Sequence, residues 1–344
     1  MGQTTVQQLG PAWDQLISGR DAEVFSSRPW LACLADAFGL RFEAVTAHVD
    51  DQLVGAIPYA AIDDLRGPRI TVLPFSDFIV PPVVDGAQWR SLADELMAHQ
   101  VPITVGAPSD SVVAEDDRFK ATSTAVRHVI PLDADYDELV ARCATQPRRH
   151  LRRAERADLH FRPATSIDEL RAFYDIHFGV RKYRHGLLCQ PFSLFECVWE
   201  RFIAPGNGAL MLGFDGDTVA GGCLLLSAGD TLYYKYAASH PDYRNHGVSH
   251  AAVFAAMELG LERGHRRLDL GRSDVDQPGL VDFKRRFGAE VEPVSRFTWM
   301  PDAHHGHDTG AGELLGRLSK LMVSPEVPDA VTEEAGNTLY HLFA

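Results

Sequence analysis

One short turn in the sequence has the residue types that bind an anion through the backbone. It reads Arg244-Asn-His-Gly247-Val-Ser249 and precedes a segment with apolar residues at helical spacing. Gly247 and Ser249 are small enough to let backbone N–H groups at a helix N-terminus face a phosphate. A plainer interpretation is a helix start that needs small residues. The turn alone leaves both open.

A second candidate for anion binding is a cluster of arginines between residues 134 and 156, a segment that we predict as one basic helix. The spacing of Arg149, Arg152, Arg153 and Arg156 places their guanidinium groups on one face. Such a stripe can bind the phosphates of tRNA or of a nucleotide-linked acceptor. The alternative is a solvated helix face paired with the acidic surface of the chain.

Two tyrosines in the strand-like run Leu232–Ala238 are two residues apart. We therefore expect Tyr234 and Tyr236 on the same side of the strand, with Tyr233 and Lys235 on the other. One pair would pack in the core, and the other would line a cleft.

These residues belong to a strand–helix–strand arrangement. After the aromatic strand and the turn, apolar residues recur at helical spacing over Val248–Arg263, and a strand-like segment over His265–Leu270 ends at Gly271. A strand, a turn, a helix and a strand within about forty residues form a βαβ unit.

The motifs resemble those of a known family. The turn is similar to the pyrophosphate-binding turn of the GNAT acyltransferases, Arg/Gln-x-x-Gly-x-Gly/Ala, from which Ser249 departs. Downstream, two blocks resemble the C-terminal part of the Fem family, the aminoacyltransferases that build peptidoglycan cross-bridges: Leu268-Asp-Leu-Gly-Arg-Ser273, and Gly279-Leu-x-x-Phe283-Lys284-x-x-Phe287-Gly288. Tyr234-Lys-Tyr236-Ala-Ala-Ser239 is similar to the aromatic strand of that family.

The resemblance implies roles for particular residues. Lys284 would lie at the reaction centre, where its charge meets a phosphate or a developing oxyanion; the alternative is a surface lysine on an amphipathic turn. The implied catalytic residues are Lys284, Phe283, Tyr236 and Asp77. The implied acceptor-binding residues are Tyr234, Arg181 and Arg184. The implied donor-binding residues are Arg244, Gly247, Ser249, Arg149, Arg152 and Arg153.

Three of these residues have plainer interpretations too. Asp77 stands in a Pro-Phe-Ser-Asp segment, and it could either hold a loop as an Asx-turn or accept a proton from an attacking amine. Arg181 and Arg184 stand at the end of a predicted helix, Ile167–Tyr183, where basic residues also favour the helix dipole.

The resemblance and the order of elements predict an α+β protein of two tandem GNAT-like domains, with mixed, mainly antiparallel sheets flanked by helices. The N-terminal domain would span residues 1–131 and the C-terminal domain residues 132–300, with the basic helix 134–156 at their junction. Residues 301–344 would form a linker and terminal helices. The long helical arm that some Fem enzymes insert in the second domain is not found in the sequence.

Composition excludes several classes of protein. The 344 residues carry a net charge of −14, which argues against broad polyanion binding but allows a local basic patch. Five scattered cysteines with no CxxC pair predict reduced thiols. The first residues show no signal-peptide pattern, and no apolar run approaches the roughly 18 residues of a membrane span. We therefore expect a cytoplasmic protein without a membrane span.

Three functions remain as hypotheses. The first is a FemAB-like acyltransferase that joins an aminoacyl or acyl donor, with aminoacyl-tRNA implied by the resemblance, to an amine on a peptidoglycan precursor, a peptide or a small metabolite. The second is an acyl-CoA-dependent GNAT N-acyltransferase. The third is a non-catalytic binding module. We predict no tightly bound cofactor and no metal site, because His304, His305 and His307 have no cysteine or carboxylate partner in the pattern.

Overall fold

The computed structural model describes residues 4–18, 24–76, 86–302 and 310–344. The chain forms two compact units. The first contains Met1–Val126, Pro293–Arg317 and His341–Ala344; the second contains Arg127–Glu292 and Leu318–Tyr340. Within the described residues, no helix combines the length and the apolar character needed to cross a membrane.

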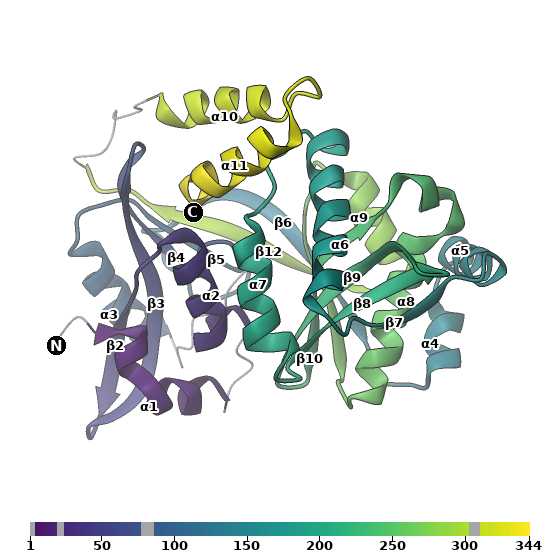
Figure 1. Ribbon diagram of the computed structural model, residues 1–344. Helices are drawn as coiled ribbons and strands as arrows, with labels where there is room; N and C mark the ends of the chain where they lie inside the picture. The colour runs from purple at the N-terminus through teal and green to yellow at the C-terminus, as the bar shows by residue number, and fades with distance from the viewer. Residues whose placement is uncertain (1–3, 19–23, 77–85, 303–309) are drawn as a thin grey trace. The chain divides into compact units, whose positions relative to one another are not determined.

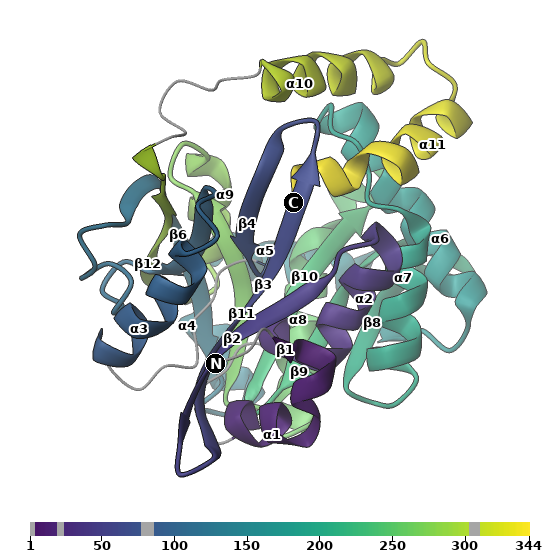
Figure 2. The same cartoon turned by 90° about the vertical axis from the view of Figure 1, so that its left-hand side faces the viewer.

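The first unit is a sheet with helices packed on it (Figure 2). Its helices are α1 (Val6–Ser18), α2 (Arg28–Phe38) and α3 (Gly86–Met97). Its strands are β1 (Thr4–Thr5), β2 (Phe42–Val49), β3 (Gln52–Asp64), β4 (Gly67–Val72) and β5 (Ile103–Pro108), in that order across the sheet, followed by β12 (Glu290–Trp299). The pairing is antiparallel except between β4 and β5.

Local sequence accounts for these elements. Helix α2 starts where the Ser27 hydroxyl accepts a hydrogen bond from the Trp30 N–H, and it ends at Gly39, whose φ of 67° suits a residue without Cβ. Asp50 and Asp51 join β2 to β3 in a hairpin: both residues have positive φ, 50° and 61°, as a tight turn between antiparallel strands requires.

The second unit has the strand order β6-β11-β10-β9-β8-β7 (Figure 1). Its strands are β6 (Lys120–Pro131), β7 (His160–Pro163), β8 (Gly208–Asp215), β9 (Thr218–Ala228), β10 (Thr231–Ser239) and β11 (Arg267–Asp274). Its helices are α4 (Tyr136–Arg142), α5 (Thr145–Arg156), α6 (Ile167–Gly179), α7 (Phe192–Val198), α8 (Val248–Glu262) and α9 (Pro278–Arg285). Strands β6 and β12 have residues in both units.

Helix α8 is the centre of the core in the second unit. It is apolar on nearly every side, as a helix enclosed by protein should be, and Phe254 and Met257 are fully buried. The cluster around it takes alternate residues of the strands, such as Cys223 and Leu225 of β9. The alternation of side chains along each strand leaves Leu224 and Leu226 for the opposite face of the sheet.

The predicted single helix over 134–156 is wrong, because the segment forms two helices, α4 and α5. The break lies at Cys143, whose ψ of 148° is extended. Pro147 stands four residues later, in the first turn of α5. In an unbroken helix its ring would clash with the carbonyl of Cys143, so the chain must restart there.

The helices near the C-terminus, predicted as a separate segment, are α10 (Ala311–Met322) and α11 (Asp329–Leu339). Residues Leu318–Tyr340 belong to the second unit. There the buried Lys182 donates hydrogen bonds to the Val327 carbonyl, at 2.6 Å, and to Asp329 Oδ1, at 2.7 Å. Gly336 lies so close to the Cys189 carbonyl that a Cβ there would be 2.5 Å from its oxygen.

Candidate active site

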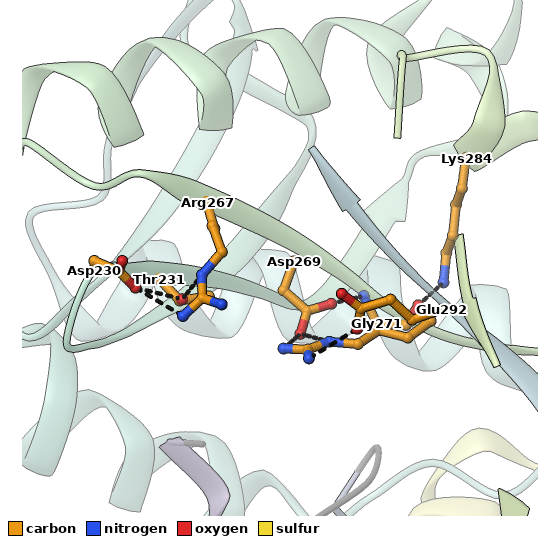
Figure 3. Close-up of polar contacts among 8 residues, drawn as sticks. Asp230, Thr231, Arg267, Asp269, Gly271, Lys284 and Glu292 are labelled. Carbon is orange, nitrogen blue, oxygen red and sulfur yellow. Dashed lines mark hydrogen bonds and ion pairs between the residues drawn. The ribbon is translucent and has the colours of Figure 1, made fainter. Parts of the chain in front are cut away.

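The strands β10 and β11 of the second unit pair only at one end. Their parallel ladder joins Thr231–Tyr233 to Arg267–Asp269. At this end Arg267 donates hydrogen bonds to Thr231 Oγ1 at 3.0 Å and to Asp230 Oδ1 at 2.9 Å (Figure 3). Both strands continue beyond the ladder, and the described residues show no further pairing between them. The parallel ladder between the two strands thus ends at Tyr233 and Asp269.

A β-bulge follows in β10, on the side that pairs with β9. Tyr234 lies opposite Leu225, but Tyr236 lies opposite Leu224, so one residue is inserted between them. Partners in a ladder share a face of the sheet, and Leu224 and Leu225 have opposite faces. The expectation that Tyr234 and Tyr236 share a face is therefore wrong. Tyr234 packs with Cys223 against the α8 core, and burial raises its pKa.

Tyr236 lies on the other face, beside aromatic residues of α6 and α7. Its ring centroid is 5.5 Å from that of His177 and 5.0 Å from that of Phe195. His177 is buried, its Nε2 is 3.1 Å from Gln190 Oε1, and its Nδ1 has no hydrogen-bond partner among the described residues. Burial lowers the pKa of His177 to about 4, so the ring next to Tyr236 is neutral. The catalytic role of Tyr236 stays a prediction.

Lys284 is buried near the end of β11. Its exposed fraction is 8%, and its Nζ donates hydrogen bonds to the carbonyls of Gly271 and Arg272, each at 3.0 Å. Figure 3 shows the contact with Gly271. The interpretation as a surface lysine is therefore wrong. Phe283 packs against the core, with ring contacts to Phe287 and His250. The roles of Lys284 and Phe283 at a reaction centre stay predictions.

The strand β6 contributes a histidine that the sequence analysis missed. His128 is completely buried, and neither ring nitrogen has a hydrogen-bond partner in the described parts of the chain. Burial and, next, the charge of Lys284 lower its pKa to about 4. The available signal was a histidine beside an arginine in a segment otherwise made of β-branched apolar residues, Val126–Ile130.

A buried ion pair fixes β11 beside β6. Arg127 Nε donates to Asp269 Oδ2 at 2.8 Å, while Asp269 Oδ1 accepts a hydrogen bond from the Gly271 N–H at 2.7 Å (Figure 3). Arg127 also contacts Glu292 Oε2 at 3.3 Å. Gly271 has a φ of 73°, a backbone conformation that is strained for a residue with a side chain. The hydrogen bond from its N–H to Asp269 holds this conformation, and the carbonyls of Gly271 and Arg272 accept hydrogen bonds from Lys284.

The glycine turn before α8 is covered by helix α5. Gly247 has a φ of 84°, and a Cβ there would lie 2.4 Å from the carbonyl oxygen of His150. The His150 ring stacks on the His250 ring of α8, with centroids 4.2 Å apart. Arg153 Nη1 donates to the Asn245 carbonyl at 3.0 Å. The helix thus contacts three positions along the turn and the start of α8.

The predicted donor-binding and acceptor-binding arginines lie near one another in the second unit. Arg149, Arg152, Arg153, Arg184, Arg244 and Ser249 are all exposed. Burial lowers the pKa of His185, and the charges of Arg184, Arg181 and Arg244 lower it further, so all three guanidinium groups are close to that ring. Arg181 also donates to the Leu188 carbonyl through Nε and Nη2, at 3.0 and 2.7 Å.

Some predicted residues are not tested by the structure. Asp77 and the histidines His304, His305 and His307 lie outside the described residues. Within the described residues, no group of three or more histidine, cysteine or carboxylate side chains is placed to hold a metal ion.

Comparison with known proteins finds a matching domain model, a relative over part of the chain and similar solved structures. Residues 141–285 match the acetyltransferase (GNAT) domain model. A stretch of 89 residues is 35% identical to the Lipid II:glycine glycyltransferase of Staphylococcus saprophyticus. The crystal structure of FemX superposes with a TM-score of 0.66 over 87% of this chain and 97% of its own, at 15% identity. The comparisons thus show a match to a GNAT domain over residues 141–285 and a fold like that of FemX.

The predicted fold, two tandem GNAT-like domains with mixed sheets flanked by helices, is confirmed by the likeness to FemX. A tandem GNAT protein from the clavulanic acid biosynthesis pathway also superposes, with a TM-score of 0.55 and 12% identity over 86% of this chain and 97% of that chain. The stretch shared with the staphylococcal glycyltransferase is 24% of this chain. It spans only about a fifth, 21%, of that relative's length.

Proposed function

We propose that this Fem-like protein is an amide-forming transferase. It moves an aminoacyl group from aminoacyl-tRNA to the amine of an acceptor such as a peptidoglycan precursor, a peptide or a small metabolite. The matches to a lipid II glycyltransferase and to FemX support the reaction class. The end of the β10–β11 ladder supports its location, because the buried ammonium of Lys284 contacts β11 just beyond it and can stabilise an oxyanion.

The residues beside this end of the ladder fit the requirements of amide formation. The attacking amine must be neutral, the oxyanion must be stabilised and the leaving oxygen must be protonated. Lys284 places a buried ammonium at the end of β11, where it can stabilise negative charge. Tyr236, beside the neutral ring of His177, offers a hydroxyl for the acceptor or for proton donation.

The observation that carries the choice of donor is the contact between Gly247 and the His150 carbonyl. Coenzyme A binding at this turn would require a pyrophosphate over the backbone N–H groups that start α8. Here an electronegative carbonyl oxygen of α5 lies against the turn. A polyanion can instead bind the exposed arginines of α5 and the nearby Arg244, which bind phosphate without a backbone pocket.

One feature favours the alternative, acyl-CoA-dependent N-acyltransfer. Gly247 adopts the left-handed conformation, and Arg244 and Ser249 are exposed at the turn, as the motif Arg-x-x-Gly-x-Ser requires. In that case α5 would have to move away before CoA binds. Calorimetric titration with acetyl-CoA therefore tests the alternative directly.

The test of the proposal uses the full chain and both donors. We expect retention of glycyl-tRNA on a filter, no heat with acetyl-CoA, and transfer of labelled glycine to lipid II detected by mass spectrometry. Replacement of Arg149, Arg152 and Arg153 by glutamine should weaken tRNA retention at least about tenfold. The matched control replaces three exposed basic residues elsewhere, Arg90, Arg317 and Lys320, and should change retention little.

Each result separates the functions. Heat with acetyl-CoA and no tRNA retention would replace the proposal with the acyl-CoA alternative. Equal loss of retention in the two triple variants would show that net charge, and not the α5 stripe, attracts tRNA. Failure of transfer with both donors and several amine acceptors would favour a non-catalytic binding module.

A further inference from the structure

The turn that follows α6 in the second unit, Val180–Arg184, is wide and strongly basic. It carries Arg181, Lys182 and Arg184, and the N–H of His185 donates to the carbonyl five residues earlier at 3.2 Å. Such π-helical turns are rare and are found frequently at functional sites. Because like charges repel one another, a turn with three cations needs contacts from outside to keep its shape.

Lys182 supplies one of these contacts, and in the described part of the chain it is the only cation of the turn with a carboxylate partner. It is buried, and its Nζ donates to the Val327 carbonyl at 2.6 Å and to Asp329 Oδ1 at 2.7 Å. The hydroxyl of Tyr183 donates to the same carboxylate oxygen. Since Asp329 is the first residue of α11, the turn is attached to the start of that helix.

Helix α11 also packs on the residues that follow the turn. Leu188 belongs to an apolar cluster with Ala335 of α11. A Cβ at Gly336 would lie 2.5 Å from the carbonyl oxygen of Cys189, so the helix approaches the backbone there directly. We call the segment Arg181–Cys189 the basic loop. The helix α11 holds it near both ends, within the second unit.

The basic loop gathers guanidinium groups that have no carboxylate partner among the described residues. Arg181 donates through Nε and Nη2 to the Leu188 carbonyl within the loop. Arg184 has no hydrogen-bond or ion-pair partner in the ranges that the structure describes, and neither has Arg244 of the turn before α8. Burial lowers the pKa of His185, and the charges of these three arginines lower it further, so they lie close to its ring.

We propose that Lys182 and Asp329 are positioning residues for the acceptor side of the site. Through their contact α11 holds the basic loop, so that Arg181 and Arg184 stay beside Arg244. The inference rests on the proposed function and on the acceptor role that the family resemblance implies for Arg181 and Arg184. Without this contact, repulsion among the guanidinium groups spreads the loop, and the acceptor binds more weakly.

The first experiment is an NMR titration of His185 in the full chain, labelled at histidine, with wild type beside Asp329→Asn. The spectrum of His185→Gln assigns the signal. Removal of a negative charge by itself lowers the pKa of a nearby histidine or leaves it unchanged. Release of the loop moves guanidinium groups away from the ring and raises the pKa. We therefore expect the pKa of His185 to rise in Asp329→Asn, towards the ordinary value of about 6.5.

The second experiment measures transfer from glycyl-tRNA to lipid II at varied acceptor concentration. An ion pair with an exposed partner contributes up to about fivefold to an equilibrium. We expect Asp329→Asn to raise the KM for lipid II by up to about fivefold, with kcat and the KM for glycyl-tRNA unchanged. Asp329→Glu keeps the carboxylate and should recover most of the loss. Lys182→Met removes both contacts of the ammonium and should act in the same direction.

The matched control is Glu334→Gln, which changes an exposed carboxylate of α11 whose contacts, with Asn337 and Thr338, stay within the helix. It should change neither readout. The proposal is overturned if the pKa of His185 in Asp329→Asn stays constant or falls, if the loss appears in kcat alone, or if Glu334→Gln raises the KM equally. Absence of transfer by wild type would refute the proposed function, and the His185 titration would still decide whether α11 positions the loop.

Discussion

Replacement of Lys284 by methionine tests the role of the buried ammonium. The variant keeps an unbranched side chain but removes the donor to the Gly271 and Arg272 carbonyls, each at 3.0 Å. Each buried carbonyl that loses its hydrogen-bond donor lowers the free energy of unfolding by about 1–3 kcal/mol. Burying methionine costs less desolvation than burying an ammonium, which offsets part of this loss. We expect the free energy of unfolding to fall by about 2–4 kcal/mol. For a unit of this size that lowers the unfolding temperature by about 4–16 °C.

The measurement is urea and thermal unfolding of Lys284→Met beside wild type, with the exposed Lys320→Met as the matched control. The control should stay within about 0.5 kcal/mol of wild type. If Lys284→Met unfolds like wild type, the two hydrogen bonds do not stabilise the fold, and the reasoning from burial is refuted. Loss of transfer at unchanged stability would instead point to a purely chemical role for the ammonium.

Three further predictions concern single contacts of the second unit. Gly247→Ala places a methyl group against the His150 carbonyl and adds about 1–2 kcal/mol of backbone strain, so hydrogen exchange of α5 should accelerate; unchanged protection would contradict the close packing. The folded pKa of His177, about 4, lies below the unfolded value, so the unfolded state binds more protons and stability falls as the pH drops from about 6.5 towards 4. His177→Gln should reduce this slope, measured as urea midpoints, by up to about 1.4 kcal/mol per pH unit, and an unaltered slope would count against a neutral buried ring. Asp269→Asn leaves the Arg127 guanidinium buried beside a neutral amide and should destabilise the fold by about 2–4 kcal/mol; Arg127→Met in the same chain should restore part of that, and no recovery would argue against the ion pair.

Local chemistry made much of the fold predictable. The helix Arg28–Phe38 and the hairpin at Asp50-Asp51 have their own capping and turn residues, so neighbours in sequence determine them. The Phe283-Lys284 motif singled out Lys284, whose role in a reaction stays a prediction, but the motif did not indicate that its ammonium is buried against two carbonyls.

The sequence-based predictions are wrong where contacts between distant segments, or one residue inserted in a strand, determine the local structure. The bulge between Tyr234 and Tyr236 moves the Tyr236 side chain to the opposite face of the sheet. No residue type in that strand predicts the bulge. The break at Cys143 was readable, since Pro147 excludes a continuous helix, but the density of arginines drew attention to helical spacing instead.

Other contacts join segments far apart in the chain. The approach of α5 to Gly247 joins residues about a hundred positions apart. His128 was missed because the groups around its ring come from β11 and α9. The residues near His128 in the sequence do not indicate these contacts.

The contacts of Lys182 with Val327 and with Asp329 at the start of α11 have a practical consequence for anyone who wishes to produce the GNAT-matching region alone. A recombinant fragment cut at the limits of the family match, residues 141–285, would lack Val327 and Asp329 and so leave a buried ammonium without its acceptors. It would also lack the strand that supplies Arg127 and His128. We expect such a fragment to be recovered in inclusion bodies, whereas one that retains Arg127–Glu292 together with Leu318–Tyr340 keeps these contacts.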